Sequence, residues 1–148
     1  CSAPARAAHT DAGSGGRADP RASRAGRCRA LPDSGAVVVL GPDCPIAPYP
    51  PLGVRAGARH RRPTRDLDRA PHGPEQALTA TQALRGMTVN AAYTAGEEHA
   101  AGRIAVGHRA DLTVLAADPL TVPATELADV PVLLTVLDGE PTHRAASL

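Results

Sequence analysis

The residue best placed to do chemistry in this sequence is Asp43. It follows the apolar run Ala36–Leu40, which turn residues flank on both sides. Such a run predicts a strand buried on both faces, as in parallel sheets, and ligand sites lie beyond the carboxyl ends of such strands. A carboxylate there can act as a general base or hold a metal ion. The alternative is a turn residue between Pro42 and Pro45, and the local pattern alone leaves both interpretations open.

The histidines and cysteines supply no ligand set of their own. His72 precedes Gly73-Pro74 in a loop, and we predict either a substrate contact or an exposed loop histidine there. His108 and His143 are expected to be exposed. None of the six histidines is spaced as a ligand pair: His9, His60, His72, His99, His108 and His143. Three cysteines match no metal spacing and no disulfide framework: Cys1, Cys28 and Cys44.

A proline-rich loop and a helix come directly after Asp43. Residues 41–53 contain five prolines, which exclude regular structure. Residues 52–62 predict a helix that Pro63 ends, and we expect its arginine cluster, residues 59–62, to form a solvated face.

Two further short helices are predicted between residues 79 and 96. Thr79 and Gln82 fit a capping box, and Gly86 is expected to break or kink the first helix. Residues 88–95 predict the second helix, from which Asn90 is expected to hydrogen-bond out of the helical region into the rest of the fold. Its inward side chains are expected to be Val89, Ala92 and Tyr93.

The remainder of the chain predicts strands. Residues 102–119 read G-R-I-A-V-G-H-R-A-D-L-T-V-L-A-A-D-P, with strands expected over 103–106 and 110–115. Asp111 opens the second of these, and we expect its carboxylate to accept bonds from turn N–H groups. Further on, 132–137 and 140–144 predict a hairpin around Asp138-Gly139, with Pro141 marking an edge strand.

Charge and composition exclude several classes of partner. All sixteen basic residues are arginine, and the net charge is +1. Residues 1–32 are basic, but no aromatic residues are interleaved with them, which argues against nucleic-acid or membrane binding. We expect this head to be a disordered or aberrant segment. No apolar run is long enough to span a membrane, and we expect a cytoplasmic protein.

Together these motifs resemble the metal-dependent amidohydrolase superfamily, in its amidohydrolase-3 branch. The 102–119 stretch matches the family phrase G-x-I-x-x-G-x-x-A-D-L-x-V-L-x-x-D-P, and V-V-V-L-G-P-D-C-P-I, residues 37–46, is similar to the end of the eighth barrel strand. The pieces H-G-P-E-Q-A-L-T and A-L-R-G-M-T-V-N-A-A-Y also match.

The resemblance implies an α/β fold in two parts. Residues 33–98 would form the C-terminal end of a (β/α)8 barrel, its last strand and helices, and residues 99–148 part of a small composite β-sandwich. Asp43 would be both metal ligand and general base. The implied activity is hydrolysis of C–N bonds in a small amide-type substrate with one or two divalent metals, of which zinc is the usual one.

Departures from the family pattern bear on activity. The sequence has no lysine and no His-x-His, and Pro42 stands where the family usually has serine. Because a catalytic metal needs about three protein ligands, we expect a fragment that is inactive as an isolated chain. The alternative is a non-catalytic remnant or pseudogene product. We also expect the isolated chain to form a homo-oligomer or to need a missing N-terminal segment.

Overall fold

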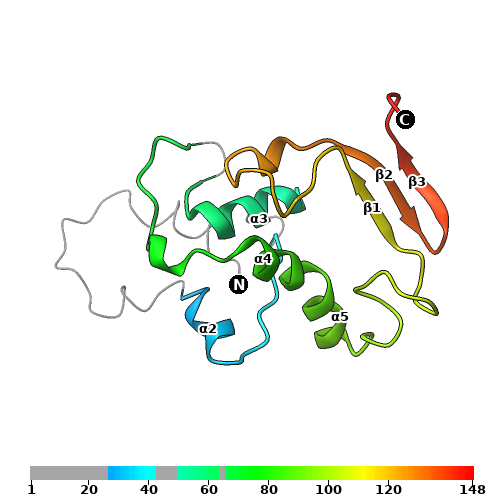
Figure 1. The fold of residues 1–148 in the computed structure, drawn as a ribbon, viewed down its shortest axis with the longest axis horizontal. Coiled ribbons are helices and arrows are strands. Elements are labelled where there is room, and N and C mark those ends of the chain that lie inside the picture. The colour runs from blue at the N-terminus through cyan, green and yellow to red at the C-terminus, as the bar shows by residue number, and fades with distance from the viewer. Residues whose placement is uncertain (1–26, 43–49, 64–65) are drawn as a thin grey trace.

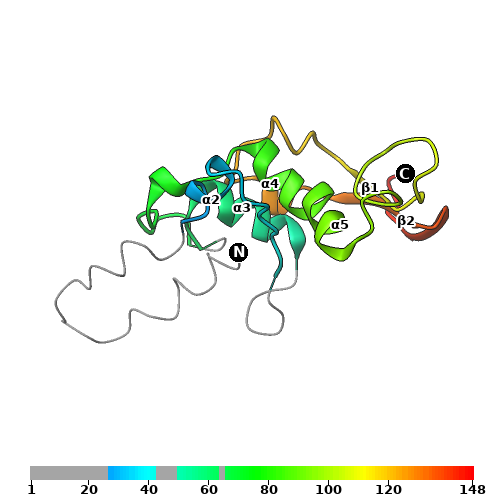
Figure 2. The same cartoon turned by 90° about the horizontal axis from the view of Figure 1, so that it is seen from below.

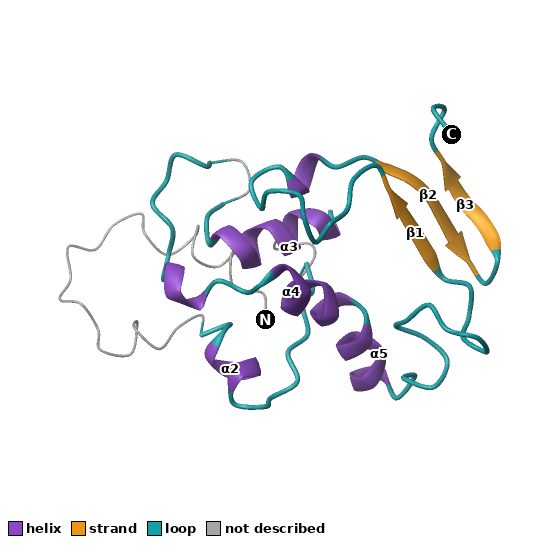
Figure 3. Cartoon of the chain, viewed as in Figure 1, coloured by secondary structure: helices purple, strands orange, loops and turns teal. Residues whose placement is uncertain are grey.

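Helices and strands occupy separate parts of the molecule. The computed structural model describes residues 27–42, 50–63 and 66–148. The helices are grouped in one part of the molecule, and the sheet lies at one end of it (Figures 1 and 3). This mixture fits the expected α/β class. No helix among the described residues is long and apolar enough to cross a membrane. The elements are α2 (Ala30–Asp33), α3 (Pro51–His60), η2 (Pro74–Gln76), α4 (Ala80–Met87), α5 (Val89–Ala95), β1 (Leu112–Leu115), η3 (Leu127–Asp129), β2 (Val132–Leu137) and β3 (Glu140–Arg144).

The sheet is a three-stranded antiparallel meander. Its order is β1-β2-β3, so that β3, which contains Pro141, is an edge strand as predicted. The second view shows this sheet projecting beyond the helices (Figure 2). Asp138 and Gly139 both have positive φ, 50° and 86°, as the predicted type I′ turn requires.

Helix α3 lies between two apolar clusters. On one side, Ala58 packs into a cluster that also draws on the chain before and after the helix; its buried members are Cys28, Val38, Leu40, Ala58, Leu78 and Ala83. On the other side, Ala56 packs with Leu127 and Val130. Pro51 starts the helix, where its missing N–H costs nothing, and His60 ends it close to the predicted boundary.

The capping box is confirmed. The Gln82 backbone N–H donates to Thr79 Oγ1 over 3.1 Å, and the Thr79 N–H donates to Gln82 Oε1 over 3.0 Å. Helix α5 follows as predicted. Ala92 is buried on it, but Tyr93 is exposed, so the expectation of an inward Tyr93 was wrong.

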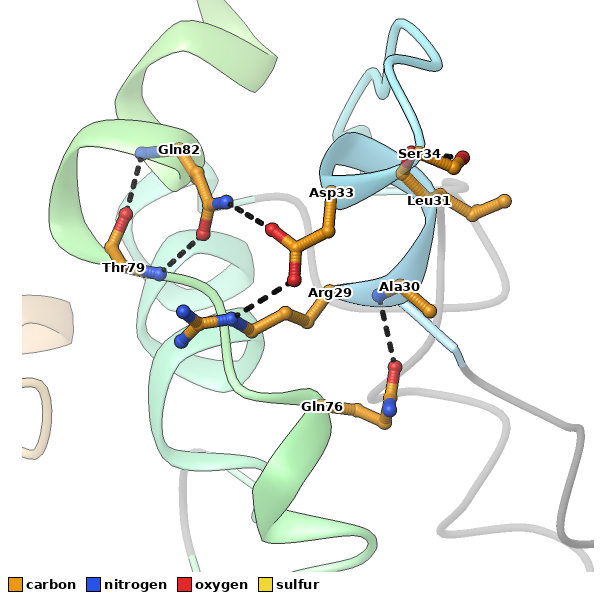
Figure 4. A network of polar contacts seen from close by, with 8 residues as sticks. All are labelled: Arg29, Ala30, Leu31, Asp33, Ser34, Gln76, Thr79 and Gln82. Atoms are coloured by element: carbon orange, nitrogen blue, oxygen red, sulfur yellow. Dashed lines mark hydrogen bonds and ion pairs between the residues drawn. The ribbon is translucent and has the colours of Figure 1, made fainter.

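Part of the segment that we expected to be disordered or aberrant is packed. Within it, Cys28 is buried and Ala30–Asp33 forms α2. Figure 4 shows how polar contacts hold α2 against η2 and the start of α4: Gln82 donates to Asp33, and the Ala30 N–H donates to Gln76 Oε1 over 3.2 Å. The expectation for residues 1–32 is therefore corrected for 27–32, while residues 1–26 lie outside the described part.

The predicted strand at Ala36–Leu40 does not form a ladder with any described segment. Val38 and Leu40 are buried, whereas Val37 is half-exposed. The run therefore buries one face, and both the Leu40 N–H and the Val38 carbonyl bond to helices, α4 and α5.

The predicted strand at Arg103–Val106 is also absent. Ile104 is 91% exposed and Val106 fully so. Because a strand is stabilised by a paired neighbour, an apolar run with no partner among the described residues stays a loop. The strand predicted over 110–115 is shorter, Leu112–Leu115.

Asp111 accepts a turn N–H as predicted. The Asp138 backbone N–H donates to its Oδ1 over 2.8 Å, and Arg109 Nε donates to Oδ2 over 3.2 Å. Asp111 is more exposed than we expected. The Asp138 bond first and Arg109 second lower the pKa of Asp111 below its usual value of 3.8. The carboxylate thus links the start of β1 to the β2–β3 turn.

Asp111→Asn is expected to destabilise the chain at pH 7. Because the folded-state pKa lies below the unfolded one, the ionised carboxylate stabilises the fold above the unfolded pKa, and this contribution is lost as pH falls through the folded pKa. Urea denaturation from pH 7 to pH 2 should therefore show wild type and variant converging in acid. Arg109→Gln should change the Asp111 pKa less, because the backbone bond is the larger cause. Equal stability of wild type and Asp111→Asn at pH 7 would contradict this prediction.

Candidate functional site

The segment that leads to Asp43 is fixed at two points. The Leu40 N–H donates to the Gly86 carbonyl over 3.0 Å. Asn90 Nδ2 donates to the Val38 carbonyl over 2.8 Å, so Asn90 does bond out of the helical region, as predicted. Helix α4 thus holds Leu40 and helix α5 holds Val38, and the stretch that they fix ends three residues before Asp43. Asp43 itself lies outside the described residues, and its role stays a prediction.

Gly86 allows this close approach. It lies inside α4 rather than breaking it, because α4 runs to Met87. A Cβ at Gly86 would lie 3.0 Å from Leu40 Cγ and 3.5 Å from the Val38 carbonyl oxygen. The glycine that we expected to break or kink the helix lies one residue before its end, Met87, and is a contact point between α4 and the segment before Asp43.

His72 has an exposed side chain on a fixed backbone. Its N–H donates to the Arg61 carbonyl over 2.8 Å, and Arg61 Nε donates to the His72 carbonyl over 3.0 Å. These bonds occupy the backbone and leave the imidazole exposed. The geometry is compatible with either sequence-based interpretation, a substrate contact or an exposed loop histidine.

The arginine cluster at the end of α3 is not a solvated face. Arg61 is buried, and its Nη1 donates to Cys28 Sγ over 3.4 Å. Arg59 is half-buried and donates to the carbonyls of Pro119 and Val122 over 3.4 and 3.2 Å. The charge pattern gave no signal for this, because the groups that cover these arginines lie far away in sequence.

Two histidines that we had not singled out as ligands have buried ring nitrogens. His60 Nδ1 accepts the Arg62 N–H over 3.1 Å, which places any ring proton of the neutral form on Nε2. Burial, together with Arg62 and Arg59, lowers the pKa of His60. His108, expected to be exposed, has both ring nitrogens buried with no hydrogen-bond partner.

The described residues do not fit a metal site on their own. Within residues 27–42, 50–63 and 66–148, no three His, Cys, Asp or Glu side chains lie close enough together to hold an ion. A zinc site needs three or four protein ligands. Any metal held by Asp43 would therefore need further ligands from beyond this part of the chain.

Most of the chain matches known amidohydrolases. The sequence model of the amidohydrolase family matches residues 5–143. The N-substituted formamide deformylase of Arthrobacter pascens is 37% identical over 111 residues, which are 75% of this chain and 20% of that protein. The Bacillus subtilis (strain 168) protein named putative amidohydrolase YtcJ is 28% identical over 112 residues, which are 76% of this chain and 21% of that protein. The chain thus spans about a fifth of these relatives.

A solved structure shares the fold. The amidohydrolase from Thermotoga maritima MSB8 superposes with a TM-score of 0.55 at 23% identity, over 82% of this chain and 27% of the solved one. At this identity the likeness concerns the fold alone.

Proposed function

The chain belongs to the amidohydrolase family, in its amidohydrolase-3 branch, and we propose that it supplies the C-terminal part of a hydrolase of amide-type C–N bonds. The observation that carries the proposal is the 37% identity over 111 residues to an N-substituted formamide deformylase. An N-substituted formamide is accordingly the first substrate to test.

We assign the division of the chain as follows. Residues 33–98 are the end of a (β/α)8 barrel, and residues 99–148 are part of a small β-sandwich. The helical region before residue 98 and the separate three-stranded sheet after it support this division. In the barrel part, the bonds from α4 and α5 to Val38 and Leu40 support a fixed backbone just before Asp43.

Asp43 is the proposed catalytic carboxylate, a general base and a ligand of a divalent metal such as zinc. One carboxylate does not hold a metal ion, and the sequence lacks both lysine and His-x-His. The remaining ligands would come from residues outside this sequence, and the 148 residues alone are expected to be inactive. His72 is proposed as a substrate contact from its exposed loop.

A chimera tests this function. The segment of the Arthrobacter deformylase that matches this chain is replaced by the corresponding residues of this chain, and formate release from an N-substituted formamide is measured. We expect the chimera to hydrolyse the substrate, and Asp43→Asn to lower its kcat by about a hundredfold or more, since a general base contributes at least that much. Asp129→Asn, the same change at an exposed acid of η3, is the control.

Two outcomes would contradict the proposal. A folded chimera with no activity would favour the non-catalytic alternative. An active chimera that Asp43→Asn leaves unchanged would remove Asp43 from the mechanism. Stoichiometric zinc and formamide hydrolysis by the isolated chain would overturn the expected inactivity.

A further inference from the structure

Helix α3 carries a buried arginine with unused hydrogen-bond donors. Arg55 is 4% exposed, and its Nε and Nη2 are buried with no hydrogen-bond partner. Arg61, also buried, donates from both Nε and Nη1. A buried charged group that lacks its partner is strongly destabilising. The fold therefore keeps at Arg55 a donor pair that requires an acceptor.

The two unused donors specify the acceptor. Nε–H and one Nη2–H lie on the same edge of the planar guanidinium and point in nearly the same direction. This edge matches the two oxygens of a carboxylate, which accepts both bonds at once. A single carbonyl oxygen would have to accept both bonds on one atom, whereas a carboxylate offers one oxygen to each. The geometry therefore favours a planar anion with two oxygens.

The surroundings of Arg55 are positively charged. Residues 51–63 contain four arginines, one histidine and no acid. Arg59, one turn further along α3, uses its guanidinium on the carbonyls of Pro119 and Val122. In the part of the chain that the structure describes, neither Arg55 nor Arg59 pairs with a carboxylate. Burial and, next, the charge of Arg59 lower the pKa of Arg55, and a bound anion would offset both.

We propose that the Nε–Nη2 edge of Arg55 binds a carboxylate group. The group has two potential sources: a small free carboxylate such as formate or acetate, or an aspartate or glutamate side chain of another polypeptide. The proposal does not depend on the hydrolase activity, because neither Asp43 nor His72 takes part in it.

A titration of the full 148-residue chain tests this site. The Nε–H signal of Arg55 is followed by ¹⁵N NMR while sodium formate is added in one arm and a blocked Gly-Glu-Gly peptide in the other, with sodium chloride and sodium sulfate at matched ionic strength. We expect a saturable shift with formate if the source is a free carboxylate, and with the peptide if it is a side chain. The backbone amide signal of Ala56, next to Arg55, is followed in wild type and in Arg55→Lys. The variant keeps the charge but loses the two-donor edge and should bind about tenfold more weakly, or about 1.4 kcal/mol. Arg85→Lys, at an exposed arginine of α4, should leave binding unchanged.

Several results would overturn the carboxylate site. They are no saturable shift in either arm, an equal shift with chloride, tighter binding of sulfate, or an unchanged affinity in Arg55→Lys. If Arg55→Lys does not fold, the wild-type Nε–H titration still decides the question.

Discussion

Gly102→Ala is expected to destabilise the chain by about 3 kcal/mol. Gly102 has a φ of +83°, a conformation that costs an L-residue about 1–2 kcal/mol. Its Cβ would lie 2.7 Å from Ala92 Cβ and 2.9 Å from the Thr88 carbonyl oxygen. Since Ala92 is buried and Thr88 belongs to the α4–α5 junction, neither gives way easily, and overpacking adds about 1–3 kcal/mol. The measurement is urea denaturation of the purified chain.

Gly107→Ala is the matched control for this substitution. Gly107 has nearly the same φ, +85°, but nothing lies within 4 Å of its Cβ position. Both substitutions change the entropy of the unfolded chain equally. The difference between their losses of unfolding free energy therefore measures the contact of residue 102 with α5. We expect Gly107→Ala to cost about 1 kcal/mol. If the two variants lose equal stability, residue 102 does not pack against α5 as the structure shows.

Local signals in the sequence predicted the local structure well. The Thr79–Gln82 capping box and the Asp138-Gly139 turn each depend on residues three apart or fewer, and both are present. Asp111 was predicted to bond a turn N–H because a carboxylate at a strand start needs partners, and it bonds Asp138. The capping box and the turn could be predicted because their atoms are chain neighbours, whereas for Asp111 the sequence predicted the kind of partner but not that Asp138, 27 residues away, supplies it.

Features that depend on distant residues could not be predicted. The runs 36–40 and 103–106 have the composition of strands, but a strand needs a neighbour to pair with, and the described residues offer none. Arg55 and Arg61 look like solvated arginines in sequence, yet both are buried, because the tertiary fold decides what covers α3. The candidate site was predicted from a family resemblance at Asp43, and the structure adds the α4 and α5 contacts that precede it.

Leu127→Ala is expected to destabilise the fold by about 3 kcal/mol. Leu127 is fully buried in η3 and is the largest side chain of the cluster that it forms with Ala56 and Val130. Removing its isobutyl group loses both the transfer free energy and the contacts around the cavity that remains, a combined cost of about 2–5 kcal/mol for buried leucines. The cluster joins α3 to the segment that leads into β2. Its loss should therefore loosen the packing between that side of α3 and the segment that leads into β2.

Leu137→Ala separates this packing effect from the loss of apolar surface in general. Leu137 ends β2 and is 61% exposed, so the same atoms are removed without a cavity, and we expect a cost below about 1 kcal/mol. Urea denaturation of both variants, followed by circular dichroism of the helices, gives the comparison. If Leu127→Ala lowers the free energy of unfolding no more than Leu137→Ala does, the cluster of Leu127 with Ala56 and Val130 does not hold α3 in place.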